Sequence, residues 1–341
     1  MRSYIFLIFM MLFMGVSCQE RKMNKQYSWV GSLSAPREYP VEIYQGALKA
    51  KNFTFTFDPI WGLIAPGWGQ DAGVMTVDSE GMALPTRLEM TWYSVQESCF
   101  YSGAWPLDRE AIEKIWEAGY ADLLSQRKGM YDKFIVGLGP KGKVVLWIAG
   151  VGQQLEVGSF RAQETLIRKD EASANAKHLF DEKYLKHIHA DSALFKADLL
   201  EQLQSQGWPE PEQYNRYQQK YPWSIVLKHE DELSILSIYY HLFNGDWYSL
   251  SEAANTRGVD ERALPDHVAV SWRSPEGQKS VAMAKFDFAD IESIFSSFPQ
   301  GTALQLYMSL SSNKKVLSLF LAGDGRQVEV KAKEVRVVHG M

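Results

Sequence analysis

Two tryptophans in a glycine- and proline-rich stretch are the residues best suited to contact another molecule. Trp61 and Trp68 lie within residues 58–73, which read DPIWGLIAPGWGQDAG, and Gln70 and Asp71 follow closely. Large aromatic rings on a polar surface anchor protein interfaces, and they also stack on sugar rings. The same rings can instead fold back over a sheet. Trp61, Trp68, Gln70 and Asp71 therefore form a candidate binding site, with a structural role as the alternative.

Two matched glutamates are the candidates for acid and base chemistry. Glu156 ends the segment AGVGQQLE, which begins at Ala149, and Glu329 ends AGDGRQVE, which begins at Ala322. A pair of carboxylates can serve as general acid and general base. However, equivalent positions of a duplicated chain lie in separate domains unless the two copies face each other. We therefore expect structural strand carboxylates at both positions.

Three further patterns resemble ligand or catalytic motifs but lack the required context. The segment GLGPKG from Gly137 matches G-x-G-x-x-G, yet the strand-like KVVLWIAG follows it instead of a helix. His187 and His189 have metal-ligand spacing for a strand, but their surroundings favour a helical or irregular segment without a third ligand. A catalytic cysteine needs a nearby histidine, and the first 177 residues contain none. We therefore expect Cys99 to be a buried, inert thiol. We expect no catalytic residues, no metal and no cofactor.

The N-terminus predicts export and lipid anchoring. Residues 1–17 carry one positive charge and an apolar run that is short for a permanent membrane span. The segment GVSC resembles a bacterial lipoprotein signal, which implies cleavage before Cys18 and acylation of its thiol. Residues 18–26 then form a tether, and the lipid bilayer is a partner through Cys18. We expect a cell-envelope location, at the outer membrane; ordinary secretion and an uncleaved anchor are the alternatives.

Composition restricts the remaining classes of protein. The chain is 46% hydrophobic and 23% charged, which is typical of a globular protein. Its formal net charge of −5 argues against general nucleic-acid binding, which requires a basic surface. With Cys18 acylated, Cys99 has no cysteine left with which to form an internal disulfide.

Four pairs of similar segments occur in the same order along the chain and indicate an internal duplication. Besides the pair that contains the two glutamates, they are YSWVGSL and YPWSIVL, ALPTRLEMTWYS and ALPDHVAVSWRS, and LDREAIEKIW and FDFADIESIF. We predict a first β-rich copy at 27–165, a helical linker at 166–220 and a second β-rich copy at 221–341. The tryptophan loop occurs in the first copy only.

Periodicity assigns the elements of each copy. Alternating apolar residues in RLEMTW and HVAVSW predict half-buried strands. Residues 107–116 have helical spacing, with Asp108 as N-cap and Gly119 at the end, and Asp287 takes the equivalent place in the second copy. A hairpin closes each copy, with GPKGK and SSNKK as turns. The fold class is therefore α+β and β-rich, with two divergent copies of an antiparallel sheet and one packed helix, joined by a helical linker.

The linker and the junctions after each hairpin carry additional signals. We predict a helix over 191–207 and expect the tyrosine stripe of Tyr214, Tyr217 and Tyr221 to dock the linker against a domain. Four glycines are expected to permit the bend between each hairpin and its next strand: Gly150, Gly152, Gly323 and Gly325.

The pattern YSWVGSLSAPREYPVEIYQG, then GWG, LPTRLEMTWYS and FIVGLGPKGKVVLWIAG resembles the bacterial family called domain of unknown function 2931. The resemblance implies membership of a family that has no established catalytic residues. Some members of that family resemble lipoproteins encoded beside secreted toxins, which implies an immunity role. We expect a non-enzymatic module that binds a protein partner in the envelope, as an inhibitor or immunity factor. A glycan-binding or glycan-processing lipoprotein is the alternative, and a purely structural envelope component is a third reading.

Overall fold

The structure is a computed structural model and describes residues 25–75, 81–123, 127–190, 201, 203, 207–229, 233–251, 258–310 and 317–339. Cys18, the signal segment 1–17 and most of the tether 18–26 lie outside these residues, as do most of the helix predicted over 191–207 and the SSNKK turn. In the part of the chain that the structure describes, no helix combines the length and the apolar character needed to cross a membrane.

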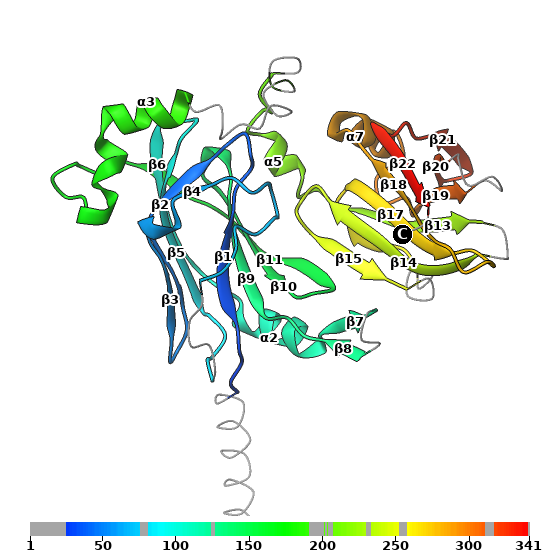
Figure 1. Ribbon diagram of the computed structural model, residues 1–341, viewed down its shortest axis with the longest axis horizontal. Coiled ribbons are helices and arrows are strands. Elements are labelled where there is room, and N and C mark those ends of the chain that lie inside the picture. The colour runs from blue at the N-terminus through cyan, green and yellow to red at the C-terminus, as the bar shows by residue number, and fades with distance from the viewer. Residues whose placement is uncertain are drawn as a thin grey trace, which may run out of the picture.

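The first half of the chain packs two β-sheets against each other (Figure 1). One sheet contains β1-β9-β10-β11, and the other has the order β12-β6-β5-β2-β3, with β4 paired to β2. The elements in chain order are β1 (Val30–Ser34), β2 (Val41–Lys49), β3 (Thr54–Phe57), η1 (Pro59–Trp61), β4 (Leu63–Ile64), β5 (Arg87–Ser94), β6 (Cys99–Pro106), α2 (Arg109–Ala118), β7 (Tyr120–Asp122), β8 (Arg127–Gly129), β9 (Lys133–Leu138), η2 (Pro140–Gly142), β10 (Lys143–Ala149), β11 (Gln153–Arg161) and β12 (Gln163–Thr165).

The alternating pattern of the sequence explains the core between these sheets. Leu88, Met90 and Trp92 on β5 are buried against β9 and β10, as their spacing predicts. Trp29 lies in the same core, and its indole Nε1 donates a hydrogen bond to the backbone oxygen of Ala83 at 3.1 Å. Together these residues join the two sheets into one sandwich.

Helix α2 begins and ends where the sequence predicts. The Asp108 side chain accepts a hydrogen bond from the backbone nitrogen of Ala111, and this satisfies one of the free N–H groups of the first turn. Gly119 ends the helix with a φ of 60°, a conformation that glycine adopts without strain. Ile112 and Trp116 are the buried residues of the helix, and they fix it against the core of the first half.

The second half also packs strands of two sheets around a core. One sheet has the order β16-β13-β19-β20-β21, and the other contains β15-β14-β17-β18-β22. Asp287 caps α7 by accepting from the backbone nitrogens of Ala289 and Asp290. The elements, with those of the linker, are η3 (Ala174–Phe180), α3 (Glu182–Ala190), α5 (Gln213–Arg216), β13 (Tyr221–Lys228), β14 (Ser234–Leu242), β15 (Trp247–Leu250), β16 (Asp260–Arg262), β17 (Pro265–Arg273), β18 (Lys279–Lys285), α7 (Phe288–Ser296), β19 (Leu304–Leu310), β20 (Leu317–Gly323), β21 (Arg326–Glu329) and β22 (Glu334–His339).

The prediction of one antiparallel sheet per copy is wrong in its detail. Among the described residues, each half packs strands of two sheets around its core, and the first half also has the two-stranded sheet β7-β8. Each half includes one parallel pair, β1 with β9 in the first and β13 with β19 in the second. The β-rich α+β class itself is confirmed. Alternation along a strand reports which residues face a core, but it does not report how many sheets enclose that core. Parallel pairing between distant segments has no local signal in the sequence.

A continuous sheet crosses from one half to the other. Strand β11 of the first half pairs with β15 of the second, with Gln153 opposite Tyr248 and Gln154 opposite Trp247. This pairing produces a nine-stranded sheet with the order β1-β9-β10-β11-β15-β14-β17-β18-β22. The two halves therefore share backbone hydrogen bonds in addition to their side-chain contacts.

The first part of the linker is anchored through a buried carboxylate. Glu42 on β2 is 1% exposed, and its carboxylate contacts His178 Nε2 at 2.8 Å and the hydroxyl of Tyr184. A buried carboxylate is tolerated only where such partners compensate for the loss of water. These contacts dock η3 and α3 against the first half.

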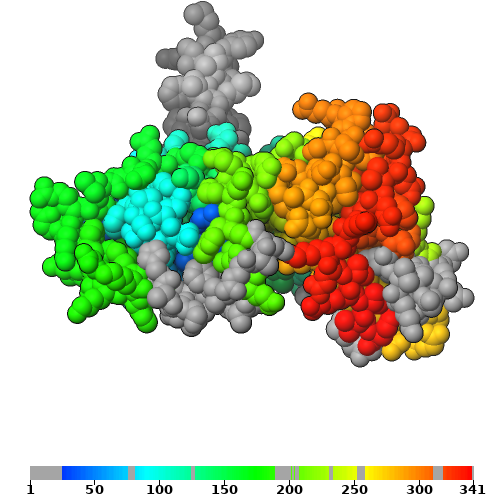
Figure 2. All heavy atoms as spheres, turned by 90° about the horizontal axis from the view of Figure 1, so that it is seen from above, coloured from blue at the N-terminus to red at the C-terminus, as the bar shows by residue number. Residues whose placement is uncertain are grey.

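The tyrosine stripe docks the rest of the linker between the two halves, as its spacing predicts. The ring of Tyr214 lies 5.9 Å from that of Tyr39 in the first half, and the ring of Tyr217 lies 4.7 Å from that of Phe288 in the second. Tyr221 packs its ring against Phe295. Figure 2 shows the yellow-green segment that contains α5 lying between the two halves.

The glycines after the two hairpins have the predicted role only in part. Of the four, only Gly325 has a positive φ, at 70°. A Cβ at Gly150 or Gly152 would instead lie within 2.7 Å of the Tyr120 side chain. Gly150 and Gly152 therefore make room for that ring, whereas Gly325 permits the turn as predicted.

Candidate functional site

The loop of the first half that contains Trp68 meets the β14–β15 turn of the second half. The side-chain nitrogen Nε2 of Gln154 donates to the backbone oxygens of Gly69 and Gly245, each at 2.7 Å. A Cβ at Gly69 would lie 2.5 Å from the Cα of Gly245, so both positions require glycine for this approach. The Trp147 indole Nε1 crosses the same junction and donates to the backbone oxygen of Asn244 at 3.1 Å.

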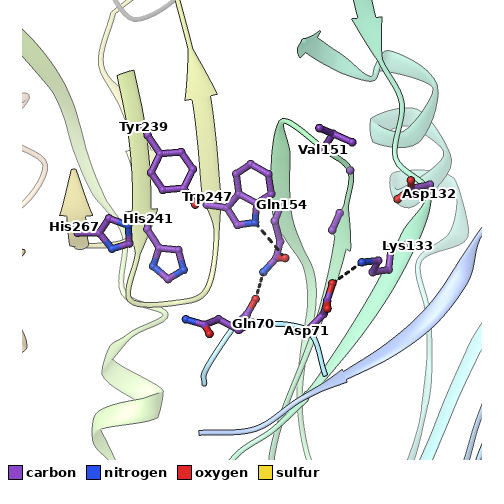
Figure 3. Close-up of a pocket in the computed structure, with 13 residues that line it drawn as sticks. Gln70, Asp71, Asp132, Lys133, Val151, Gln154, Tyr239, His241, Trp247 and His267 are labelled. Atoms are coloured by element: carbon purple, nitrogen blue, oxygen red, sulfur yellow. Dashed lines mark hydrogen bonds and ion pairs between the residues drawn. The ribbon is translucent and has the colours of Figure 1, made fainter. Parts of the chain in front are cut away.

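A cavity of about 440 Å³ lies beside this junction, and both halves line it (Figure 3). Its polar side includes the ion pair between Asp71 and Lys133, and its opposite side includes the half-buried rings of Tyr239 and Trp247. The lining residues are Gly69, Gln70, Asp71, Asp132, Lys133, Ala149, Gly150, Val151, Gln154, Tyr239, His241, Trp247 and His267. This size and mixture of side chains suit a small ligand or an inserted side chain of a partner.

The predicted site residues divide into two groups. Gln70 and Asp71 are exposed and line the cavity. Trp61 and Trp68 do not line it, and both are half-buried. The structure therefore brings Gln70 and Asp71 together with residues of the second half. The two tryptophans, which lie outside the cavity lining, pack against buried residues.

Trp68 packs inward at the junction of the two halves. Its ring centroid lies 5.1 Å from that of Trp147 and 5.5 Å from that of Tyr214, both with edge-to-face geometry. Trp61 packs on the core of the first half, with its ring 5.9 Å from that of Phe57. These ring contacts give Trp61 and Trp68 the structural role that was the alternative to binding.

The glutamates matched in the sequence are not brought together. Glu329 is exposed on β21, whereas Glu156 is half-buried on β11 beside Asp246 of the second half. The backbone nitrogen of Glu156 donates to Asp246 Oδ1 at 2.6 Å, and the Asn244 amide donates to Glu156 Oε2 at 3.1 Å. The Gln218 amide also faces the Glu156 carboxylate. Glu156 is therefore paired with Asp246 and not with Glu329.

Burial changes the acidity of this pair. It raises the pKa of Glu156 to about 7, and the charge of Asp246 adds to the increase. Burial also raises the pKa of Asp246 to about 6, although the hydrogen bond from Asn244 opposes this. Both carboxyl groups therefore retain protons at pH values where an exposed carboxyl has lost its own.

Two histidines and an aspartate lie where the second half borders the cavity. His241 on β14 and His267 on β17 line it, and Asp266 lies beside both imidazoles. Burial would raise the pKa of Asp266, but the neighbouring His241 and His267 imidazoles outweigh burial and hold the pKa well below its usual range. No spacing rule finds this group, because His241 and His267 become neighbours only through the pairing of β14 with β17.

The other motifs take simple structural positions. GLGPKG ends β9, forms the turn η2 and leads into β10, so a strand follows the glycines as predicted. His187 and His189 both lie in α3, so the segment is helical, as one of the two structures that its surroundings predict. Cys99 is half-buried, and burial raises the pKa of its thiol, as expected for an inert side chain.

Comparison with known families adds an independent finding. The model of the family described as "Protein of unknown function (DUF2931)" matches residues 17–195, just over half of the chain. The chain belongs to this family. No curated protein and no solved structure matches it.

The DUF2931 match contains only one side of the cavity. Gln70, Asp71 and Lys133 lie within the matched residues, whereas His241 and Trp247 lie beyond them. In this DUF2931 protein, the complete cavity therefore requires both the family segment and the chain that follows it.

Proposed function

We propose that this DUF2931 protein is a lipid-anchored protein of the cell envelope that binds another protein at the cavity between its two halves, as an inhibitor or immunity factor. The observation that carries the proposal is the composition of this cavity, which places exposed residues of the first half beside aromatic residues of the second. We propose a binding role and no catalytic role for this surface.

The rim of the cavity has the chemistry of a protein interface. Val151 lines the cavity at the tip of the β10–β11 turn and is 71% exposed. The same cavity is lined by the exposed polar residues Gln70 and Asp71 and by the half-buried Trp247. Apolar and aromatic contacts surrounded by polar groups are typical of surfaces that bind proteins.

Attachment to the bilayer is proposed through Cys18. The GVSC sequence supports acylation of this residue, and the family match begins at residue 17, next to it. Acyl chains on one cysteine contribute roughly 0.8 kcal/mol per buried methylene, which is sufficient for stable anchoring when two or more chains are present. The tether 18–26 then leads to Tyr27 at the start of the first half, and we propose the outer membrane as its location.

We also propose that the two halves arose by duplication, with boundaries at 27–165 and 221–341. The arrangement of their strands supports this, because β1-β9-β10-β11 corresponds to β13-β19-β20-β21, and β12-β6-β5-β2-β3 corresponds to β22-β18-β17-β14-β15. The Trp223 indole donates to the backbone oxygen of Ala263 at 3.0 Å, as Trp29 does to that of Ala83.

A glycan ligand is the second candidate function. The rings of Tyr239 and Trp247 line the cavity 5.8 Å apart, and the Gln70 amide and the Asp71 carboxylate lie at its other side. Aromatic rings with nearby amide and carboxylate groups can bind a sugar by stacking and hydrogen bonding. In this alternative the sugar stacks on Trp247, which lines the cavity, and not on Trp61 or Trp68, the residues proposed from the sequence.

A matched pair of substitutions tests the protein-binding proposal. Val151→Asp introduces a charge at the rim of the cavity, and Leu166→Asp makes the same change at an 87% exposed residue that does not line it. We expect Val151→Asp to reduce recovery of the partner at least tenfold, because a buried unpaired charge opposes association. The measurement is quantitative mass spectrometry after chemical cross-linking in cells and purification of the full-length chain.

The control must retain the partner at the wild-type level. Equal recovery with Val151→Asp and Leu166→Asp would exclude the cavity rim as the binding surface. Absence of a specific protein partner, together with glycan binding that is lost in Trp247→Ala, would favour the second candidate.

A further inference from the structure

Two histidines on adjacent strands face the same side of the nine-stranded sheet. His241 on β14 lies directly opposite His267 on β17 in the strand register, and their rings are stacked with centroids 4.8 Å apart and planes 10° apart. Tyr240 and Val268, the next residues along each strand, point into the core of the second half. The two imidazoles therefore lie together on the side that borders the cavity.

A β-bulge adds a carboxylate to these histidines. The register of β14 and β17 shifts after His241, whose neighbour Leu242 pairs with Pro265, so Asp266 has no direct partner on β14. Strict alternation would direct Asp266 away from His267. A bulge changes the direction of a side chain, and here Asp266 Oδ2 lies 3.3 Å from His241 Nδ1 and 3.1 Å from His267 Nδ1.

We propose that His241, Asp266 and His267 bind a divalent transition-metal ion of the Zn²⁺ type. The ligand atoms of these three residues all lie within 4.8 Å of one another. Four ligands arranged tetrahedrally around Zn²⁺ at about 2.0–2.1 Å are separated by about 3.3 Å, and the two measured N–O distances of 3.3 and 3.1 Å are close to this value. Two imidazoles and one carboxylate form a ligand set that such ions prefer.

Both imidazole Nδ1 atoms face the same carboxylate oxygen, but only one of these contacts has hydrogen-bond geometry. His267 Nδ1 forms a hydrogen bond with Asp266 Oδ2, whereas the buried Nδ1 of His241 lies 3.3 Å from the same oxygen without hydrogen-bond alignment. Coordination to a shared cation requires no N–H···O alignment between His241 and Asp266, and it would bring both imidazole nitrogens and the carboxylate oxygen into one ligand set. Because both imidazoles line the cavity, the remaining coordination position of the ion would be reached from there.

Zinc binding by the full-length chain tests this site. The chain is purified in detergent without a histidine tag, and Zn²⁺ binding is measured by titration calorimetry and elemental analysis. We expect one equivalent of Zn²⁺ per chain. His267→Gln and Asp266→Asn should each weaken binding at least ~100-fold, because loss of a ligand costs no less than loss of an outer-shell partner. His187→Gln changes an exposed histidine of α3 and should leave the affinity unchanged.

A second measurement separates loss of the site from loss of the fold. Each metal-free variant is compared with the metal-free wild type by near-ultraviolet circular dichroism, and Co²⁺ absorption in the visible range reports the ligands directly. A Co²⁺ spectrum that is present in wild type and His187→Gln, and absent from folded Asp266→Asn, supports the proposal. Failure of the wild type to bind stoichiometric Zn²⁺ or Co²⁺ would overturn it, as would equal affinity in wild type and Asp266→Asn.

Discussion

Replacement of Trp147 by alanine is expected to lower the free energy of unfolding by about 4 kcal/mol. The side chain is fully buried, and its indole Nε1 donates to the backbone oxygen of Asn244 in the second half. Gly137 and Gly245 make room for the ring, since a Cβ at either position would lie within 2.7 Å of it. The substitution therefore opens a large cavity where the two halves meet. Urea denaturation, followed by circular dichroism, measures the change.

A surface tryptophan provides the matched control. Trp208 is 40% exposed, and Trp208→Ala should change the free energy of unfolding by about 1 kcal/mol or less. A double-mutant cycle between Trp68 and Trp147 should give a coupling energy of about 1 kcal/mol, because their rings are in edge-to-face contact. Similar small losses of unfolding free energy in Trp147→Ala and Trp208→Ala would contradict the claim that Trp147 stabilises the junction. A coupling energy of zero would contradict a structural role for Trp68.

Replacement of Glu156 by glutamine is expected to stabilise the protein by about 2 kcal/mol at pH 8. The folded protein holds the pKa of Glu156 at about 7, above the ordinary value of 4.5, because burial and Asp246 oppose its charge. Below about pH 4.5 the group is protonated in the folded and the unfolded chain alike. As the pH rises towards 7, the unfolded chain releases the proton first and becomes relatively more stable.

The wild type should therefore lose stability between about pH 5 and pH 7.5, and Glu156→Gln should remove much of this loss. Thermal unfolding across this pH range measures both effects. Glu329→Gln, at the exposed glutamate that the sequence matches to Glu156, should follow the wild-type profile. An unchanged pH profile in Glu156→Gln, or destabilisation at pH 8, would contradict the assignment of a protonated carboxyl to this junction.

Elements determined by neighbouring residues could be predicted from the sequence. Asp108 and Gly119 identify the ends of α2 because capping depends on the residues beside a helix terminus. Alternation in RLEMTW identifies the inward face of β5 for the same reason. The joining of β11 to β15 could not be predicted, because it depends on how two segments that are distant in the sequence pack together.

The candidate site could be predicted only in part. Gln70 and Asp71 line the cavity, and their place in a loop unique to the first half identifies them. Trp68 lies in the same loop but folds inward, since Trp147 and Tyr214 provide an apolar surface that the sequence of the loop does not reveal. His241 and Trp247 reach the cavity only through the pairing across the two halves, so no motif contains them.

Site-specific photo-cross-linking tests the central claim, which is that the cavity between the halves binds a protein. A photoreactive amino acid is placed at Val151 on the cavity rim, or at the exposed control position Leu166 outside the cavity, in the full-length chain in its own cells. The proposed function predicts one discrete cross-linked partner from position 151 and none from position 166. No cross-linked protein from position 151, or the same products from both positions, would contradict it.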